Sequence, residues 1–454
     1  MSYSTAFVRA PAASERGSVS NGGRLSRASR CRAAPAPRSV ICRAAKQENE
    51  TTMAVKVTKV LQQGMVAVAA AATVAMPATI MLPDQAMPQA EAVGQKTNLP
   101  NGDPTKNAKA LLRDALPINN KPIRAIQREL ESISEALRIP GSKSLGPVAR
   151  SVRKSEQILK DKKSEIVSAF AKSKADDGLL ALVNLSSALS EFDTVLENQD
   201  KQEVPIIQQK CLDAVGAVEE AMVDGFPFAV PDAYAGLPQL KGRATLQMDL
   251  KFNKAKDNLP GGTMIIVLDG YSAPVTAGNF MDLVNRGFYN GMEIQRADGF
   301  VVQTGDPDGP AVGFVDPRTK ETRTIPFEVL VAGDSDPTYE DTLEDLGRFQ
   351  DLPILPFNAF GTLAMARSEN DPNSGSSQVF FLLKESELTP SGANLLDGRY
   401  AVFGYITEGQ DLLTDCSLGD KITNVKVIKG QENLVVPDGG PSLQIADAVT
   451  EVAQ

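Results

Sequence analysis

Apolar residues recur at helical spacing through residues 105–224. The pattern is clearest in 121–139, KPIRAIQRELESISEALRI, where apolar positions alternate at intervals of three and four, as one stripe of a helix does. These positions are Ile123, Ile126, Leu130, Ile133 and Leu137. Pro122 suits a first helical position, and Pro140-Gly141 ends the segment.

The same spacing predicts three further long helices, after a shorter one at about Thr105–Leu116. Their stripes are Val148, Val152, Leu159, Ile166 and Phe170; then Leu179, Leu182, Leu185, Leu189, Phe192 and Leu196; then Ile206, Ile207, Leu212, Val215, Val218 and Met222. One stripe per helix and short polar links predict an up-and-down bundle. We interpret the stripes as core. A coiled coil is less consistent with the Pro and Gly residues that interrupt the pattern.

The period changes after 225–242, a Pro- and Gly-rich segment that we interpret as a linker. Its residues Phe226, Phe228 and Tyr234 indicate that it packs against a neighbour. RATLQMDLKF, which begins at Arg243, alternates apolar and polar residues as a half-buried strand does. Further strands are expected at 262–270, 291–297, 300–305, 361–366, 378–384, 399–406 and 421–429.

Many short strands with few helices predict a barrel or a sandwich. One amphipathic helix is expected at 275–289. The pair Asp298-Gly299 lies between two alternating runs, which is a strong signal for a β-hairpin. This hairpin contains Arg296 and Gln303, two polar residues beside Phe300 and Val301.

Composition restricts the chemistry, because the 454-residue chain contains no His. Ser-His-Asp catalysis, Cys-His catalysis and His metal sites are therefore excluded. The four Cys residues, Cys31, Cys42, Cys211 and Cys416, have no CxxC spacing, which disfavours a zinc or redox motif. For Cys211 and Cys416, two separate buried thiols are favoured over a disulfide between predicted domains.

Two targeting signals in series are expected at the N-terminus. Residues 1–45 are rich in Arg and Ser, with Glu15 as their acidic residue, as in an organelle transit peptide. An apolar run, 64–82, then precedes Ala90-Glu91-Ala92, which fits a cleavage site. A membrane span is the alternative, but the run is Ala-rich and contains Pro77. The order resembles plastid import followed by transfer to the thylakoid lumen.

Removing these basic segments leaves a chain more acidic than the full-length net charge of −9. Such a surface repels nucleic acid and anionic membranes. The acidic stretch 334–345 loosely resembles a calcium loop but lacks its central Gly, so we expect no metal site. We also expect no cofactor.

Five segments of the second half occur in the order found in cyclophilins. They are APVTAGNFMDLVNRGFYNGMEIQRADGFVVQTGDP, FGTLAMAR, NSGSSQVFFLL, LLDGRYAVFGYITEGQDLL and GDKITNVKVIKG. With the targeting signals and the helical segment, the chain resembles the multidomain thylakoid-lumen cyclophilins of plants and algae. The resemblance implies a multidomain α + β protein in which a helical bundle precedes a closed antiparallel eight-stranded barrel. It also implies peptidyl-prolyl cis–trans isomerisation.

The resemblance assigns site residues by motif position. It implies that Arg296, Phe300 and Gln303 are catalytic. It implies that substrate-binding positions are Val301, Ala366, Arg367, Gln378, Phe380, Leu395, Leu396 and Tyr400. Four positions depart from the common pattern. Leu395 stands for a Trp, Tyr400 for a His, Arg367 for an Asn and Val301 for a Met. The Arg367 departure alone is mild, whereas loss of the Trp and the His together implies weak activity.

Two functional classes follow from the resemblance. One is an isomerase of proline-containing segments that assists photosystem II assembly and repair in the lumen. The other is a degenerate docking protein or chaperone that binds lumenal loops of photosystem proteins, with peripheral association with thylakoid membrane proteins. We also expect contact between bundle and barrel, with the bundle covering the groove, and a lid or partner surface at 307–357. The expected segments are 1–45 and 46–92 for targeting, 93–224 for the bundle, 225–242 for the linker, 243–437 for the barrel and 438–454 for a tail.

Overall fold

The computed structural model describes residues 105–138, 145–256, 259–384 and 394–437. The expected targeting segments, 1–45 and 46–92, and the expected tail, 438–454, lie outside these residues.

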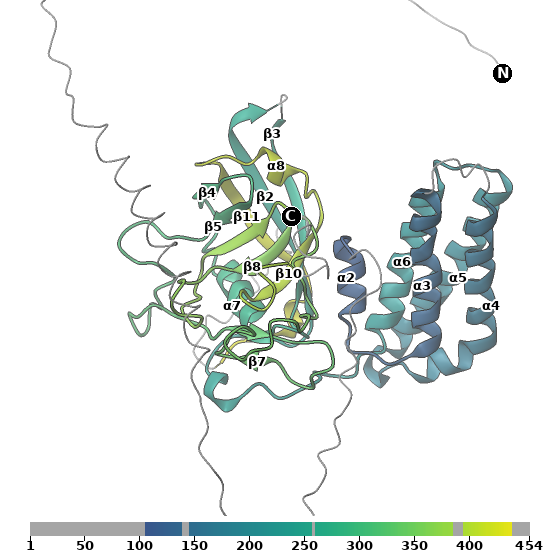
Figure 1. Cartoon of the computed structure of the whole chain (residues 1–454), viewed down its shortest axis with the longest axis horizontal. Coiled ribbons are helices and arrows are strands. Elements are labelled where there is room, and N and C mark those ends of the chain that lie inside the picture. The colour runs from purple at the N-terminus through teal and green to yellow at the C-terminus, as the bar shows by residue number, and fades with distance from the viewer. Residues whose placement is uncertain (1–104, 139–144, 257–258, 385–393, 438–454) are drawn as a thin grey trace, which may run out of the picture. The chain divides into compact units, whose positions relative to one another are not determined.

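The N-terminal part of the described chain is helical, as predicted (Figure 1). Each of the four long helices packs on the next, and the first also packs on the last, so they close into a bundle. The helices are α2 Ala108–Asp114, α3 Lys121–Arg138, α4 Gly146–Ser168, α5 Ala175–Glu197 and α6 Val204–Glu220. The predicted stripes supply one apolar core. Leu137, Leu179 and Ile206 are exceptions, because each is exposed close to a helix terminus.

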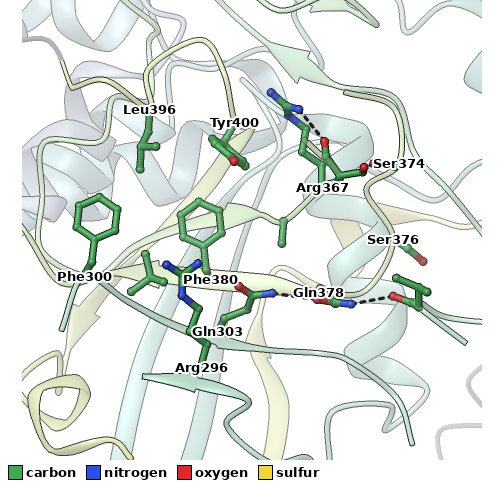
Figure 2. A pocket seen from close by; sticks show the side chains of 14 residues that line it. Arg296, Phe300, Gln303, Arg367, Ser374, Ser376, Gln378, Phe380, Leu396 and Tyr400 are labelled. Atoms are coloured by element: carbon green, nitrogen blue, oxygen red, sulfur yellow. Dashed lines mark hydrogen bonds between the residues drawn. The ribbon is translucent and has the colours of Figure 1, made fainter. Parts of the chain in front are cut away.

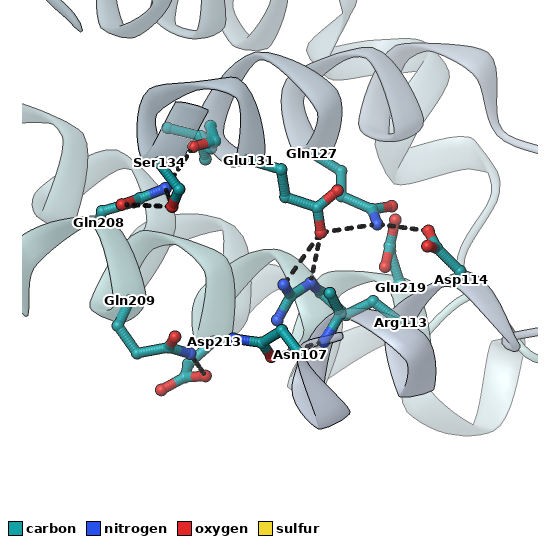
Figure 3. Close-up of polar contacts among 12 residues, drawn as sticks. Asn107, Arg113, Asp114, Gln127, Glu131, Ser134, Gln208, Gln209, Asp213 and Glu219 are labelled. Atoms are coloured by element: carbon teal, nitrogen blue, oxygen red, sulfur yellow. Dashed lines mark hydrogen bonds and ion pairs between the residues drawn. The ribbon is translucent and has the colours of Figure 1, made fainter. Parts of the chain in front are cut away.

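A network of charged and amide side chains links α2 to the bundle (Figure 3). Arg113 of α2 pairs with Glu131 of α3 at 2.9 Å, and Gln127 also donates to that carboxylate at 3.1 Å. Deeper inside, Arg124 lies 3.2 Å from Glu219, whose side chain is fully buried and whose Oε2 has no hydrogen-bond partner within the described part of the chain. Burial raises the pKa of Glu219 to about 7, and the nearby arginines only partly oppose that rise.

The second half forms one antiparallel sheet of eight strands in the order β11-β2-β3-β10-β8-β9-β5-β4 (Figure 1). The strands are β2 Arg243–Lys256, β3 Leu259–Asp269, β4 Arg296–Ala297, β5 Val301–Thr304, β8 Thr362–Met365, β9 Val379–Leu382, β10 Val402–Glu408 and β11 Lys421–Lys429. All eight were expected, but β4 is much shorter than 291–297. Just before β4, an isolated bridge joins Glu293 to Lys421 of β11. Backbone hydrogen bonds flank this bridge, from Ile294 N–H to the Asp420 carbonyl at 2.7 Å and from Ile422 N–H to the Met292 carbonyl at 2.8 Å. Complete closure of the barrel stays a prediction.

The sheet has an apolar cluster on each face. The larger cluster contains α7, Pro274–Asn285, whose Phe280 is fully buried against Tyr289 and Phe403. The second cluster contains Val301, Phe380 and other residues that alternate with those of the first. Apolar residues of α2 join this second cluster: Ala108, Leu111, Leu112 and Ala115. The expected contact between the helical segment and the sheet is made by α2, and α6 adds an ion pair between its Glu220 and Arg243 of β2 at 3.6 Å.

Two short strands were missed, one before and one after the eight-stranded sheet in the sequence. Gln239–Leu240, in the expected linker, forms β1 and pairs with β12, Leu434–Val435. Leu240 is fully buried in the larger cluster. Two residues are too few to show a period, so the alternation that revealed the long strands gave no signal here.

The stretch 307–357 is anchored to the start of α7 by a buried carboxylate. It contains β6, Glu328–Val329, which pairs with β7, Thr338–Tyr339. The Glu328 carboxylate accepts hydrogen bonds from the backbone N–H groups of Val275 and Thr276 at 3.2 and 2.9 Å. These groups lie at the start of α7, where a helix presents unpaired donors and a partial positive charge. The stretch is thus packed against the fold over this region.

Cys211 and Cys416 are buried thiols that are not joined to each other, as favoured from the sequence. Burial raises the pKa of Cys211 to about 12, so its thiol stays protonated near neutrality. We therefore assign Cys211 a packing role in the bundle core.

The buried Glu219 makes bundle stability dependent on pH. Because its folded-state pKa is raised to about 7, the folded state holds a proton between about pH 4.3 and 7 that the unfolded state releases. Stability should therefore fall as pH rises through this window. We expect Glu219→Gln to remove part of this fall, on the order of 1–3 kcal/mol. Thermal unfolding followed by helical circular dichroism at pH 5.5 and pH 8 would measure it.

The control is Glu191→Gln, which removes an exposed carboxylate of α5 that pairs with Lys210. It should leave the pH dependence of unfolding as in the unmodified chain. The same pH dependence in Glu219→Gln and the unmodified chain would contradict the assignment.

Candidate active site

A tight β-hairpin holds the first site residues. Arg296 pairs with Gln303 and Ala297 with Val302, so the two loop residues are Gly299 and Phe300. Gly299 has φ +79°, as a glycine at the first loop position of a type II′ turn does. The predicted loop, Asp298-Gly299, was therefore placed one residue too early. Phe300 lies at the tip of the hairpin instead of inside β5.

A single row of directly paired residues carries the site across the sheet. Arg296 of β4 lies opposite Gln303 of β5, which lies opposite Phe380 of β9. Phe380 in turn lies opposite Ala364 of β8. Directly opposed residues project on the same face of a sheet, so Arg296, Gln303 and Phe380 share one face. Val301, two residues before Gln303, joins them for the same reason.

These side chains line a cavity of about 340 Å³ (Figure 2). Its lining contains Arg296, Phe300, Val301, Gln303, Val312, Ala366, Arg367, Ser368, Ser374, Ser376, Gln378, Phe380, Leu396 and Tyr400. The structure thus brings together every candidate residue except Leu395. Leu395 is 59% exposed and does not line the cavity, because the chain turns between it and Leu396. No described bundle residue contributes to the lining, so the expected covering of the groove is not seen.

Aromatic rings form the apolar floor. Phe380 is 6% exposed and stacks on Phe357, with ring centroids 6.0 Å apart and planes 7° apart. Tyr400 meets Phe380 edge-on, with centroids 5.4 Å apart. The guanidinium of Arg367 lies 4.9 Å from the centre of the Tyr400 ring and donates to the carbonyls of Arg399 and Ser368 at 2.9 and 2.8 Å. Arg367 therefore holds the wall in place.

The opposite wall is polar. The Gln303 amide donates to the Gln378 side-chain oxygen at 2.9 Å. Gln378 donates in turn to the Asp306 carboxylate at 3.0 Å and to the Val312 carbonyl at 2.9 Å. This chain of bonds fixes both amides at the edge of the cavity, where they can meet the backbone of a bound peptide.

Arg296 directs its guanidinium towards Phe380 and Gln303 (Figure 2). Its Nε and Nη2 lie 2.7 and 2.6 Å from Oδ2 of Asp298. The other oxygen of Asp298 accepts from the backbone N–H groups of Phe300 and Val301 at 2.9 and 3.0 Å. These two backbone bonds, with the Arg296 pair, lower the pKa of Asp298 to about 2. The carboxylate is therefore ionised at neutral pH.

A second carboxylate positions Leu396. Asp397 accepts from the backbone N–H groups of Phe357 and Asn394, both at 2.8 Å. Asn394 also donates to the Phe357 carbonyl at 3.1 Å. Burial raises the pKa of Asp397 to about 6 in spite of these bonds. The turn that carries Leu396 is thereby attached to the residue beneath Phe380.

The arrangement combines an apolar slot with one permanently charged donor. Phe300, Val301, Phe380 and Leu396 offer aromatic and aliphatic surface of the kind that holds a pyrrolidine ring. Arg296 presents N–H donors at the edge of the same slot. The site can therefore bind a proline ring and donate a hydrogen bond to the atoms beside it.

Family comparisons agree with both halves of the chain. Residues 250–432 match the model of the cyclophilin-type peptidyl-prolyl cis–trans isomerase family. Residues 107–223 match the PsbQ-like domain of CYP38-like peptidyl-prolyl cis–trans isomerases. The chain belongs to the cyclophilin-type peptidyl-prolyl cis–trans isomerases and, within them, to the CYP38-like group with a PsbQ-like helical domain.

Two relatives match both the helical part and the sheet. The chain is 53% identical over 337 residues to peptidyl-prolyl cis-trans isomerase CYP38, chloroplastic, of Arabidopsis thaliana, covering 74% of this chain and 77% of that protein. It is 44% identical over 338 residues to a putative thylakoid lumen peptidyl-prolyl cis-trans isomerase of Synechocystis, covering 74% of this chain and 86% of that protein.

Sequence reasoning missed the lining residues Val312, Ser368, Ser374 and Ser376. It also missed three residues that support the site from behind the lining. Phe357 and Asp397 support the floor, but they act through contacts between distant segments and have no local signal. Asp298 was identified as a turn residue alone. An Asp side chain can accept a hydrogen bond from the backbone N–H two residues later. Asp298 also lies two residues after Arg296, and this spacing was the available sign that it could contact that side chain.

The neighbouring leucines allow a matched test of the slot. Leu396→Ala removes apolar surface from the cavity, and we expect it to weaken binding of an Ala-Pro peptide by about 5–30-fold, or roughly 1–2 kcal/mol. Leu395→Ala removes the same atoms from an exposed position and should bind within about twofold of the unmodified protein. Peptide titration followed by NMR measures both. Equal weakening by the two variants would contradict the assigned lining.

Proposed function

We propose that this chain catalyses cis–trans isomerisation of X-Pro bonds in protein segments, with Arg296 as the catalytic donor. The observation that carries the proposal is that Arg296 and the apolar residues of the slot line the same cavity. Family membership supports it independently.

The reaction needs neither a nucleophile nor a metal. Rotation about a peptide C–N bond is opposed by a barrier of about 18–20 kcal/mol, because lone-pair delocalisation gives the bond double-bond character. As the bond twists, the prolyl nitrogen pyramidalises and its lone pair becomes a better hydrogen-bond acceptor. A donor fixed beside that nitrogen binds the twisted form more tightly than the planar one, which lowers the barrier. Arg suits this role because it stays protonated and its donors form a rigid fork.

The remaining residues have distinct roles in this proposal. Phe300, Val301, Phe380 and Leu396 hold the pyrrolidine ring in the slot. Gln303 and Gln378, linked at 2.9 Å, hold the flanking peptide carbonyl. The ring is then fixed while the peptide on its N-terminal side rotates.

We place this activity in the chloroplast thylakoid lumen, on proline-containing lumenal loops of photosystem II subunits during assembly and repair. The N-terminal sequence supports import followed by export, and the names of the two relatives include "chloroplastic" and "thylakoid lumen". The closed eight-stranded barrel belongs to the same proposal, supported by the bridge between Glu293 and Lys421.

A docking protein without turnover is the second candidate. The exposure of Leu395 favours it, because the position where the family commonly has Trp contributes nothing to the cavity. A slot that lacks this wall grips proline less firmly. Such a groove would bind lumenal loops without accelerating their rotation.

Arg296→Ala separates the two candidates. We expect it to lower isomerisation of an X-Pro peptide by about 10- to 100-fold, since it removes a donor used in the twisted state. Peptide affinity should change by less than about threefold, because the apolar slot remains. A protease-coupled peptide assay and an NMR titration measure the two quantities.

Complementation of a strain that lacks the protein supplies the second readout. Failure of Arg296→Ala to restore photosystem II assembly agrees with the enzyme. Full restoration by an Arg296→Ala variant that no longer isomerises would contradict the enzymatic role and leave the docking protein.

A further inference from the structure

We propose that Asp298 is a positioning residue that orients the Arg296 guanidinium for isomerisation. This inference rests on the proposed function and adds a residue to it. Asp298 does not line the cavity, so it acts through Arg296 and not on the peptide. Asp298 lies within the segment that carries Arg296 and Gln303, but the resemblance assigns it no role.

The hairpin turn fixes the Asp298 carboxylate before Arg296 meets it. One oxygen, Oδ1, accepts from the backbone N–H groups of Phe300 and Val301 at 2.9 and 3.0 Å. Phe300 is the second loop residue and Val301 is the first residue of β5, so the carboxylate is held by the fold of the hairpin. The second oxygen, Oδ2, is left pointing towards the side chain at position 296.

Arg296 uses one edge of its guanidinium for this carboxylate. Nε and Nη2 both reach Oδ2, at 2.7 and 2.6 Å. A guanidinium has five N–H donors in a planar fork. Engaging Nε–H and one Nη2–H leaves three donors that are not used by Asp298. Figure 2 shows the guanidinium lying towards Phe380 and Gln303, and Arg296 lines the cavity. Fixing one edge thereby aims the other edge into the cavity.

Without Asp298 this aim would be lost. The Arg296 side chain is 52% exposed, and among the described residues Asp298 is its hydrogen-bond partner. Gln303, the nearest polar side chain in the row, donates to Gln378 instead. A long side chain without a partner samples several rotamers, and each productive encounter must then select one. A catalytic group must be held close to its working geometry.

The carboxylate also opposes the positive charge of Arg296, but this effect is the smaller one. Asp298 is 42% exposed, so water screens its field. Rotation of the peptide bond redistributes partial charge and creates no full charge for the carboxylate to repel. We therefore expect loss of orientation to dominate when Asp298 is changed.

Asp298→Asn tests the proposal in the full chain. The amide oxygen of Asn can still accept from Phe300 and Val301, so the turn is kept, while the fixed anionic partner of Arg296 is removed. We expect kcat/KM for an Ala-Pro peptide to fall by about three- to tenfold, less than the roughly 100-fold that a 1 Å misplacement can cost. The loss should lie in kcat, with peptide affinity unchanged. Asp308→Asn, which removes an exposed carboxylate after β5, should match the unmodified protein.

A double-mutant cycle distinguishes positioning from a merely structural role. In an Arg296→Ala background, Asp298→Asn should have no further effect, because no guanidinium is left to orient. NMR of the Arg296 Nε–H group should show an ordered, slowly exchanging signal that becomes mobile in Asp298→Asn.

Each failure has its own signature. Equal loss in both backgrounds, or unchanged or raised activity of Asp298→Asn while Arg296→Ala is impaired, would overturn the role of Asp298 alone. An unchanged Nε–H signal in Asp298→Asn would overturn it as well. Full activity of Arg296→Ala would overturn the proposed function, and this inference with it.

Discussion

The register of three antiparallel strands is the constraint on which the site depends. Because Arg296 pairs with Gln303 and Gln303 with Phe380, a cation, an amide and an aromatic ring lie in one row on one face of the sheet. A slip of one residue would turn each side chain to the other face, into the packed apolar cluster of Val302 and Phe381. The two-residue turn at Gly299–Phe300 sets this register. The backbone donors that hold Asp298 belong to Phe300 of this turn and to Val301, which follows it.

Long periodic elements were predictable from the sequence, and contacts between distant segments were not. Each helix of the bundle and each long strand repeats its apolar pattern often enough to be recognised. The shortened β4 and the two-residue β1 carry no period, so their bounds depend on neighbours such as β12. The turn was predicted one residue too early. Asp298-Gly299 has the composition of a loop, but Asp298 precedes the two loop residues and accepts hydrogen bonds from the backbone after it.

The site shows the same division. The motifs that resemble cyclophilins located Arg296, Phe300, Gln303 and Phe380, and the structure places all four around one cavity. Leu395 was assigned to the substrate-binding site by its motif position, next to Leu396. The chain turns at these residues, so Leu395 is exposed and Leu396 lines the cavity. Phe357 and Asp397 support the floor from segments that no local pattern connects. A residue's side-chain direction at a turn depends on backbone geometry that composition does not specify.

Gripping a proline and rotating its bond are separate abilities, and they have unequal support in the site. The aromatic floor and the oriented Arg296 are present, whereas the wall at position 395 is missing. Two-dimensional exchange NMR on an Ala-Pro peptide with a catalytic amount of the unmodified full chain tests the central claim directly. If the chain is an isomerase, cross-peaks between the cis and trans signals should grow with mixing time on a subsecond scale. Bound-state broadening of both signals without such cross-peaks would contradict it.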